Sequence, residues 1–158
     1  MQKIAPCLWF DGNAEEAARF YTSVFTESRI ATTMLYTEAG PGPKGDVLAI
    51  TFEIEGQEFM ALNGGPQYKF SPAISLMVHC ESQAEVDSLW EKLCADGGSP
   101  WQCGWLQDRF GVSWQIVPNG FIELIRDPDT EKAARTMKAM MKMGKLDLAA
   151  LQAAHRGD

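Results

Sequence analysis

The chain has few of the side chains that most often hold metal ions, and it has no long apolar run. Only two histidines occur among its 158 residues, and no two of the four cysteines form a Cys-x-x-Cys pair, so zinc-type spacing is absent. No stretch approaches the roughly 20 apolar residues of a transmembrane helix, and the first residues lack the apolar stretch of a signal peptide. We therefore expect a cytoplasmic protein with reduced, largely buried thiols and no membrane association.

Positive charge is also scarce. Fourteen Lys and Arg stand against 21 Asp and Glu, which gives a formal net charge of −7. Non-specific binding to nucleic acids and to anionic membranes depends on an excess of Lys and Arg, so neither partner is expected. Eight Phe, five Trp and eight Met supply enough apolar bulk for a core and a lined pocket. The length fits one domain, or two half-domains that share a core.

The sequence contains an internal repeat with an offset of 69 residues. Asn13–Glu16 opens one amphipathic segment and Ser82–Glu85 opens another, and both have the spacing of a helix capping box. Each follows a short apolar run, at 8–10 and at 76–78. Two copies of one small unit usually build one site between them, so the repeat predicts two similar modules.

Periodicity and turn residues predict strand, helix and three strands in each copy. Gly40–Gly45 alternates Gly and Pro and must be a loop, and Glu55-Gly56 suits a tight hairpin turn. The expected strands lie at 4–10, 28–36, 47–54, 57–62 and 73–79, then one or two within 100–107, and a last one at 112–117. Antiparallel half-sheets of this kind leave an open, curved face, and two halves would close a barrel-like cavity.

The pattern changes after Pro118. We expect paired modules over 1–118, the first at 1–66 and the second at 72–118, and a C-terminal helical extension over 119–158. Within the extension, a helix is expected to start at 127–129 and a short final helix to occupy 145–154. Methionines on one side of the first helix favour core or dimer packing, because Met fills irregular gaps.

This order of elements resembles the vicinal oxygen chelate superfamily, which includes glyoxalase I and the extradiol dioxygenases. Three segments are similar to a narrower group, the PhnB-like or 3-demethylubiquinone-9 3-methyltransferase-like proteins: Leu8–Ala17, Gly56–Gly65 and Cys103–Pro118. The tail from Asp127 to Asp147 also resembles that group. The resemblance implies an α+β fold in which two βαβββ modules form an open barrel of the glyoxalase/bleomycin-resistance type. It also implies a homodimer.

In metal-dependent members of the superfamily, four positions supply the metal ligands, and the resemblance places them at Pro6, Met60, Ser75 and Gln115. A divalent-metal site needs several His, Glu, Asp or Cys donors that converge on one point. Pro6 and Met60 offer no good hard donor, Ser75 is weak and Gln115 is neutral. We therefore expect no metal at the usual site, no cofactor, and no glyoxalase I or dioxygenase activity.

The remaining chemical groups are also weak candidates for catalysis. His79 ends a strand and His155 lies in the tail, and both favour a capped or solvated role over a ligand role. Cys7 and Cys103 have no base that can be placed beside them, so packed thiols are expected. A methyltransferase would need a Gly-rich turn that opens a helix, and Gly64-Gly65-Pro66 does not open one.

Aromatic and polar residues remain to line a pocket for a small molecule. Asn63 and Gln115 are the best polar groups to orient a ligand, and Trp114 should face the helix if Gln115 faces the cavity, because the two alternate on one strand. The candidate pocket residues are Trp9, Asn63, Trp101, Cys103, Trp105, Asp108 and Gln115.

These observations predict a small-molecule-binding protein of the vicinal oxygen chelate fold, without the usual metal site and with an open question of whether it catalyses a reaction. The alternative is an enzyme (a lyase, a dioxygenase or a methyltransferase-like protein) with a non-standard metal or acid–base site among Glu53, Glu58, Asp108 and Gln115. A third hypothesis is a regulatory or interaction protein that uses the Met-rich tail helix as its contact surface.

Overall fold

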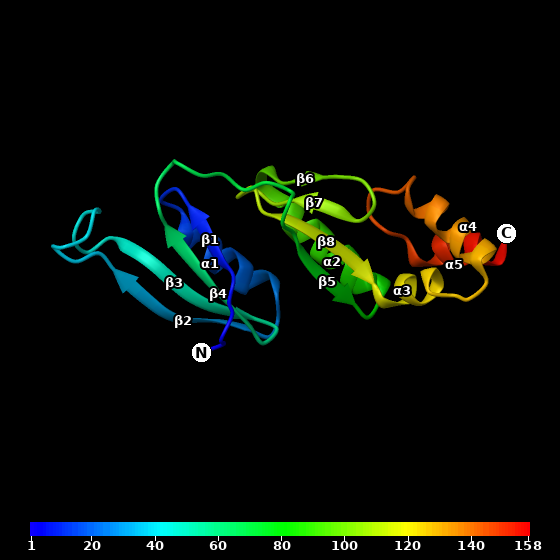
Figure 1. Cartoon of the computed structure of the whole chain (residues 1–158), viewed down its shortest axis with the longest axis horizontal. Helices are drawn as coiled ribbons and strands as arrows, with labels where there is room; N and C mark the ends of the chain where they lie inside the picture. The colour runs from blue at the N-terminus through cyan, green and yellow to red at the C-terminus, as the bar shows by residue number, and fades with distance from the viewer. The chain divides into compact units, whose positions relative to one another are not determined.

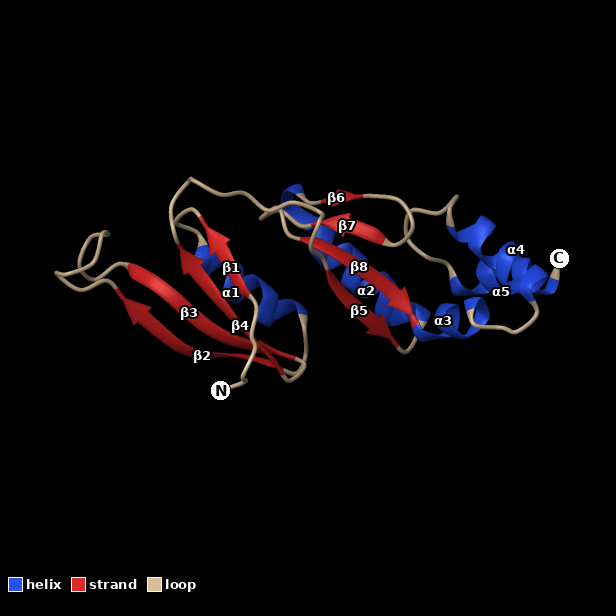
Figure 2. Cartoon of the chain, in the orientation of Figure 1, coloured by secondary structure: helices blue, strands red, loops and turns tan.

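The computed structural model describes residues 1–158 and divides into two compact units, Met1–Phe70 and Ser71–Asp158. The fold is α+β, as predicted, and each unit begins with a strand, a helix and three further strands (Figures 1 and 2). The separation of residues 1–118 from residues 119–158 stays a prediction, because the second unit contains both the second module and the C-terminal helices.

The first unit holds a four-stranded sheet in the order β1-β4-β3-β2, with one helix on one face (Figure 1). Its elements are β1 (Cys7–Phe10), α1 (Ala14–Val24), β2 (Ser28–Leu35), β3 (Val47–Ile54) and β4 (Gln57–Asn63). β1 pairs with β4 in parallel, so the expectation of an antiparallel half-sheet is wrong at this pair. The reason is topological, since α1 carries the chain to the opposite edge of the sheet, and the β2–β3–β4 meander then reverses direction twice and ends beside β1.

Apolar residues on α1 and on the sheet form the core of the first unit. Tyr21 on α1 is fully buried and its ring stacks on Phe52 of β3, with centroids 6.0 Å apart. Phe52 stacks in turn on Phe59 of β4 at 5.4 Å. Complete burial of such side chains stabilises the fold by about 2 kcal/mol each. The predicted hairpin turn is confirmed, because Glu55 and Gly56 both have the positive φ angles that a tight turn between twisted strands requires.

The second unit repeats this plan with shorter strands. It contains β5 (Leu76–Cys80), α2 (Gln83–Cys94), a 3₁₀ turn (Ala95–Gly97), β6 (Ser99–Pro100), β7 (Trp105–Gln107) and β8 (Ser113–Pro118). The order is β5-β8-β7-β6, and β5 again lies parallel to the last strand. α2 begins 69 residues after α1, and its buried side chains pack over β7 and β8. The internal repeat in the sequence is therefore a structural repeat.

Three helices follow β8: α3 (Asn119–Ile125), α4 (Thr130–Met140) and α5 (Leu148–Arg156) (Figure 1). The last two were predicted, whereas α3 was not. Val117, Phe121, Leu146 and Leu151 form the buried cluster that holds these helices to the end of β8. None of the helices combines the length and the apolarity that crossing a lipid bilayer demands.

The chain between α4 and α5 is bound to the second module through its backbone. Met143 and Gly144 accept hydrogen bonds from the N–H groups of Cys103 and Gly104, both at 2.8 Å. The Gln83 side chain on α2 donates to the carbonyl of Leu146 at 2.9 Å and accepts from the N–H of Leu148 at 2.8 Å. The segment is therefore attached at both ends of its path across the second unit.

The cysteines are less buried than expected. All four are free thiols, but only Cys80 is buried, Cys94 and Cys103 are half-buried, and Cys7 is exposed. Burial, reinforced by the nearby charge of Glu85, raises the pKa of the Cys80 thiol to about 12. Cys7 is exposed because it starts β1 on the sheet face that α1 does not cover, a feature that local periodicity does not reveal.

Candidate functional site

The sheet of the second unit carries no strongly charged side chain. Its four strands have the sequences Leu-Met-Val-His-Cys, Ser-Pro, Trp-Leu-Gln and Ser-Trp-Gln-Ile-Val-Pro, with no Asp, Glu, Lys or Arg among them. α2 covers one face, where Leu106, Trp114 and Ile116 are buried. Residues that alternate with these point to the other side, which we call the open face of the second sheet.

A hydrogen bond between two side chains marks the centre of this open face. Nε2 of Gln115 on β8 donates to Oγ of Ser75, which immediately precedes β5, over 2.9 Å. Both residues are half-buried. Leu76 pairs with Trp114 and Met77 with Gln115 in the parallel register, so the bond joins neighbouring strands. This bond orients the Gln115 amide, because Nε2 donates to Ser75. The carbonyl oxygen Oε1 remains as the acceptor of the amide.

Ser113 adds a polar group to the same face. It lies two residues before Gln115 on β8 and therefore points the same way. Its side chain is only 1% exposed, and its Oγ atom has no hydrogen-bond partner. A buried hydroxyl without a partner costs about 1–3 kcal/mol, and most buried polar groups do have one. Sequence analysis missed Ser113, although its alternation with Gln115 was a usable signal.

Apolar side chains flank these polar groups. Trp105 on β7 pairs in register with Gln115, and Met77 on β5 pairs with it from the other side. Trp105 is half-buried and Met77 is exposed. The row Met77–Gln115–Trp105 therefore places an amide between a thioether and an indole, which is a surface suited to a small organic molecule.

The positions that the resemblance assigns to metal ligands form two adjacent pairs, each within its own unit. In the first unit the N–H of Met60 donates to the carbonyl of Pro6 at 2.9 Å, and in the second unit Gln115 bonds Ser75. No group of three or more His, Cys, Asp or Glu side chains in the structure could hold a metal ion. A proline, a thioether, a hydroxyl and a neutral amide do not fit a divalent metal, which prefers imidazole, thiolate or carboxylate donors.

Asp108 holds a turn between β7 and β8. Its Oδ1 accepts hydrogen bonds from the N–H groups of Phe110 (2.9 Å) and Val112 (3.1 Å), and its Oδ2 accepts from the indole of Trp114 at 2.9 Å. The side chain is 2% exposed. Asp108 thus lies beside Trp114, whose side chain points away from the open face.

Asn63, at the end of β4, joins three segments of the first unit. Its Oδ1 accepts from the N–H of Ala14 at 2.9 Å, and its Nδ2 donates to the carbonyl of Val47 at 3.0 Å. Asn13 was expected to cap α1, but its side chain makes no capping bond, because Asn63 reaches the first helical N–H from the sheet. At α2, by contrast, the predicted Ser82 cap is present and accepts from Glu85 N.

The other candidate pocket residues lie in different places. Trp9 in the first unit donates to the carbonyl of Gly65 at 2.9 Å and packs edge-on against Tyr68. Trp101 and Cys103 lie in the loop between β6 and β7, which the segment before α5 holds. The structure therefore brings Trp105 and Gln115 onto one face and does not gather all seven candidates within one unit.

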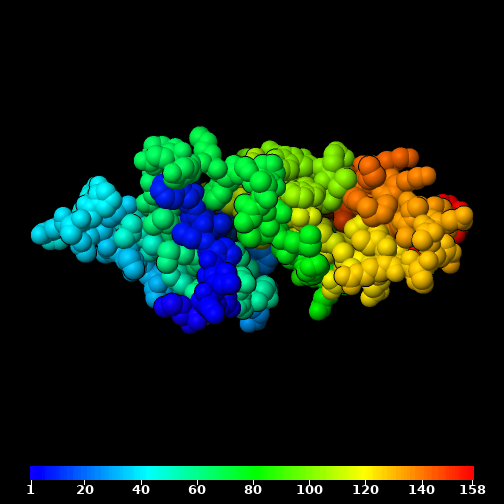
Figure 3. All heavy atoms as spheres, viewed as in Figure 1, coloured from blue at the N-terminus to red at the C-terminus, as the bar shows by residue number.

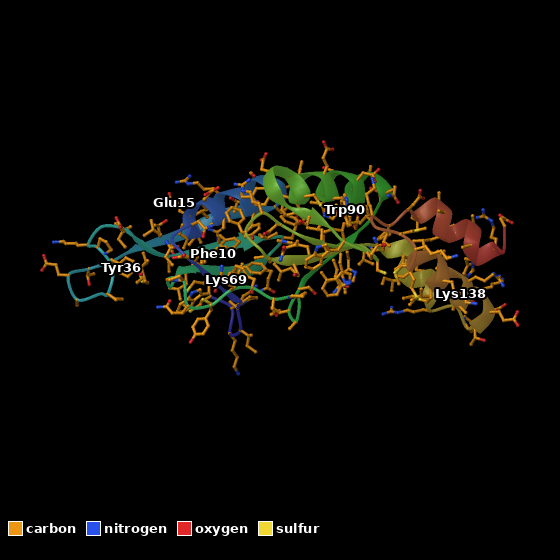
Figure 4. All side chains as sticks on the ribbon, turned by 90° about the horizontal axis from the view of Figure 1, so that it is seen from above. Phe10, Glu15, Tyr36, Lys69, Trp90 and Lys138 are labelled. Carbon is orange, nitrogen blue, oxygen red and sulfur yellow. The ribbon has the colours of Figure 1, made fainter.

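A cleft of about 500 Å³ lies in the first unit, between the start of α1 and the loop that joins β2 to β3. Its lining includes Tyr36 and Asn63 together with the carboxylates of Asp11, Glu15 and Asp46. Figure 4 shows Glu15 on α1 and Tyr36 where β2 passes into the loop, and Figure 3 shows that loop, in cyan, projecting from the first unit. Both polar ends of the Asn63 side chain are already bonded to the backbone.

One expectation about a titratable residue is wrong, and two further candidates can be placed. His155 was expected to be solvated, but its side chain is 15% exposed and its Nε2 lies 2.9 Å from Oδ2 of Asp127, because α5 packs back toward the start of α4. Glu53 pairs with Arg29 on the neighbouring strand at 2.9 Å. Glu58 lies opposite Glu53 in the register of β3 and β4, so two of the four residues named for the alternative acid–base site are neighbours.

The chain is similar to one protein family and to several solved structures. The family model described as 3-demethylubiquinone-9 3-methyltransferase matches residues 2–117. The solved structure of a PhnB protein from Bacillus cereus is 41% identical with a TM-score of 0.67, and the match covers 74% of this chain and 99% of that one. A protein from Pseudomonas aeruginosa is 25% identical with a TM-score of 0.61, over 75% and 98% of the two chains.

The fosfomycin resistance protein FosX from Listeria monocytogenes is 13% identical with a TM-score of 0.51, over 75% and 93% of the chains, a likeness that concerns the fold alone. None of the curated proteins compared matches the chain. The family match ends at residue 117, so the expected resemblance of the tail from Asp127 to Asp147 is not part of it.

Proposed function

The chain belongs to the 3-demethylubiquinone-9 3-methyltransferase family of PhnB-like proteins, and from this membership we propose that it binds a small organic molecule on the open face of its second sheet. The single observation that carries this proposal is the buried Ser113 hydroxyl, which has no hydrogen-bond partner within the protein. A ligand group that displaces the side chains covering this hydroxyl supplies the partner and recovers the free energy that the unpartnered hydroxyl costs.

The surroundings of Ser113 support the same function. Gln115 is fixed by Ser75 through Nε2 and keeps its carbonyl oxygen Oε1 as an acceptor, while Trp105 and Met77 offer apolar surface on either side. Small-molecule sites are mostly apolar, with a few fixed polar groups that set the orientation of the ligand. Of the seven candidate pocket residues, the proposal uses Trp105 and Gln115, and the other five stay predictions.

The proposed binding needs no metal ion, because the donors at the superfamily's ligand positions suit none. Methyl transfer is not part of the proposal. The turn Asp11–Asn13 before α1 has a single glycine, and Gly64–Gly65 is followed by no helix, so neither offers the Gly-rich turn at a helix start that commonly binds S-adenosylmethionine. The enzyme alternative with a non-standard acid–base site is less well supported, since Glu53 is paired with Arg29 and the carboxylate of Asp108 holds a turn.

We also propose a homodimer. β2 is an edge strand of the first sheet, and its last residues Met34 and Leu35 are exposed apolar side chains. Exposed apolar edges of this kind are commonly covered by another chain. Light scattering on the full chain tests this point: a mass of twice 17.5 kDa is expected, and a monomer at micromolar concentration contradicts it.

A fragment screen followed by NMR tests the binding function directly. Fragments are expected to shift the side-chain amide signals of Gln115 and the indole signal of Trp105, while the indole signal of Trp90 on α2 (Figure 4) stays unchanged. The screen is run with a chelator and again with divalent ions. Binding that maps elsewhere, or binding only in the presence of an ion, contradicts the proposal.

The variant Ser113→Ala sharpens the test. It removes the unpartnered hydroxyl, so the free protein is expected to be as stable as the wild type or more so, while fragment binding weakens several-fold. Ser88→Ala, on the exposed side of α2, is the matched control and leaves binding unchanged. A Ser113→Ala variant that loses stability and keeps its affinity would show that the hydroxyl has a purely structural role.

A further inference from the structure

The groups on the open face differ in what they can offer to a ligand. Because Gln115 Nε2 donates to Ser75, the Gln115 carbonyl oxygen Oε1 is the amide atom left to accept a hydrogen bond. The Ser113 hydroxyl has no partner and can either donate or accept. The Ser75 hydroxyl, which accepts from Gln115, keeps its own proton to donate.

From this arrangement we infer the chemical class of the ligand: an uncharged group that carries one hydrogen-bond donor and one acceptor side by side, as a carboxamide does. Its N–H donates to Gln115 Oε1 and its carbonyl accepts from the serine hydroxyls. This inference rests on the proposed function and names the ligand class for the same face.

The lack of charged side chains on the four strands supports an uncharged ligand. None of the four strands carries Asp, Glu, Lys or Arg, and His79 and Cys80 are the only titratable side chains on them. A carboxylate or ammonium group that entered beside the buried Ser113 would lose its hydration without meeting a charge of opposite sign. A neutral amide loses less hydration and recovers it through hydrogen bonds of the ordinary kind.

The amide at position 115 points the same way when it is compared with a carboxylate. A glutamate at position 115 would present acceptors only, which suits a metal ion or a cationic group. Glutamine has the same shape but presents both N–H donors and an acceptor, and here one of its two N–H groups is already bound to Ser75. Trp105, the register partner of Gln115, then gives a planar surface for a flat or aromatic part of the ligand.

Three probes of nearly the same shape test the inference: benzamide, benzoate and benzamidinium. Benzamide carries a donor and an acceptor, benzoate only acceptors with negative charge, and benzamidinium only donors with positive charge. Fragments of this size bind at about millimolar concentration, so titration followed by NMR of the Gln115 and Trp105 side chains is suitable. Benzamide is expected to bind about tenfold more tightly than either charged probe.

Three variants, one of them a control, make the test specific. Gln115→Glu replaces the amide by a carboxylate and is expected to reverse the order, so that benzamidinium binds more tightly than benzamide. Gln152→Glu, which is exposed on α5, makes the same change in net charge and should leave the order unaltered. Ser113→Ala is expected to weaken benzamide several-fold and to leave the weak binding of the charged probes nearly unchanged.

The outcomes separate this inference from the function on which it rests. Tighter binding of benzoate or benzamidinium at the same side chains overturns the ligand class and leaves small-molecule binding at this face intact. No shift at Gln115 or Trp105 with any probe overturns the ligand class as well, and the fragment screen then decides the broader function independently. An unchanged order in Gln115→Glu would show that the amide does not select the ligand.

Discussion

The indole N–H of Trp114 donates a hydrogen bond to the carboxylate of Asp108 across 2.9 Å in the interior of the second unit. Both side chains are 2% exposed. The other oxygen of Asp108 accepts two backbone N–H groups of the turn that leads into β8. This carboxylate therefore fixes where β8 begins, and so determines which β8 side chains reach the open face.

We predict that Asp108→Asn lowers the free energy of unfolding by about 3 kcal/mol, because an amide group places a donor opposite a donor in a buried site. Trp114→Phe should cost about 2 kcal/mol, since it leaves one carboxylate oxygen without its partner. Urea denaturation of both variants and of the double variant measures the coupling between them. Full stability of Asp108→Asn would instead reassign the carboxylate to ligand binding or catalysis.

A second stability prediction concerns Asn63, and Asn13 at the start of the same helix serves as its comparison. Asn63→Ala removes the cap of α1 and the bond to Val47, so a loss of about 2 kcal/mol is expected. Asn13→Ala should change stability by less than about 0.5 kcal/mol, because the Asn13 side chain makes no capping bond. Thermal and urea unfolding of the two variants distinguish the sheet-derived cap from the local one. Equal losses would contradict the capping role of Asn63.

The comparison of Asn13 with Asn63 also shows how far sequence reasoning reaches. Patterns within one segment predicted the repeat, seven of the eight strands and the helices α1, α2, α4 and α5, although β1 and β5 begin three residues later than expected. Asn63 lies 49 residues from the N–H that it caps, and no local pattern reports such a contact. Alternation along one strand was enough to predict that Gln115 and Trp114 point to opposite faces of the sheet. The absence of a hydrogen-bond partner for Ser113, by contrast, depends on all of its neighbours in three dimensions.

Helix α3 was missed for a related reason. It begins with Asn119-Gly120 directly after Pro118, a combination that is typical of turns. Short helices are only marginally stable alone and depend on tertiary packing. Here Phe121 supplies that packing by entering the buried cluster with Leu146 and Leu151. The strand at Ser99–Pro100 has two residues and is likewise defined by its partner rather than by its own sequence.

The attachment of the C-terminal segment can be tested at a glycine. Gly104 has a φ of +81°, and a Cβ atom there would lie 3.0 Å from Leu146 Cγ and 3.1 Å from the carbonyl oxygen of Ile116. Gly12 has nearly the same φ, +84°, but no atom lies within 4 Å of its would-be Cβ. Gly12→Ala is expected to cost about 1 kcal/mol from backbone strain alone, and Gly104→Ala about 3 kcal/mol because Leu146 must also move.

Hydrogen exchange locates the effect of each glycine variant. In Gly104→Ala the amides of Leu148 and of the rest of α5 should lose protection, whereas in Gly12→Ala they should exchange as in the wild type. Similar costs for the two variants, or unchanged protection of α5 in Gly104→Ala, would mean that Leu146 does not fix the segment to the loop before β7.

Acid should loosen the C-terminal helices before the rest of the chain. The N–H of Asp129, followed by the imidazole of His155, holds the pKa of Asp127 below its usual value of 3.8. The Lys145 ammonium, with help from Gln83, likewise lowers the pKa of Asp87 on α2. A carboxyl group whose pKa is lower in the folded state contributes stability above its unfolded pKa, and this contribution is lost as the pH falls through the folded value.

We therefore expect the protection of α5 amides to be constant from neutral pH to about pH 4 and to fall below it. Asp127→Asn should abolish most of this acid dependence, because the amide does not titrate, and should reduce protection at neutral pH by loss of the charged partner of His155. Asp158→Asn, which removes the carboxylate charge that pairs with Arg156 in the exposed last residues, is the matched control and should keep the wild-type profile. An acid profile that Asp127→Asn leaves unchanged would assign the pH dependence to other carboxylates, with Asp87 as the next to replace.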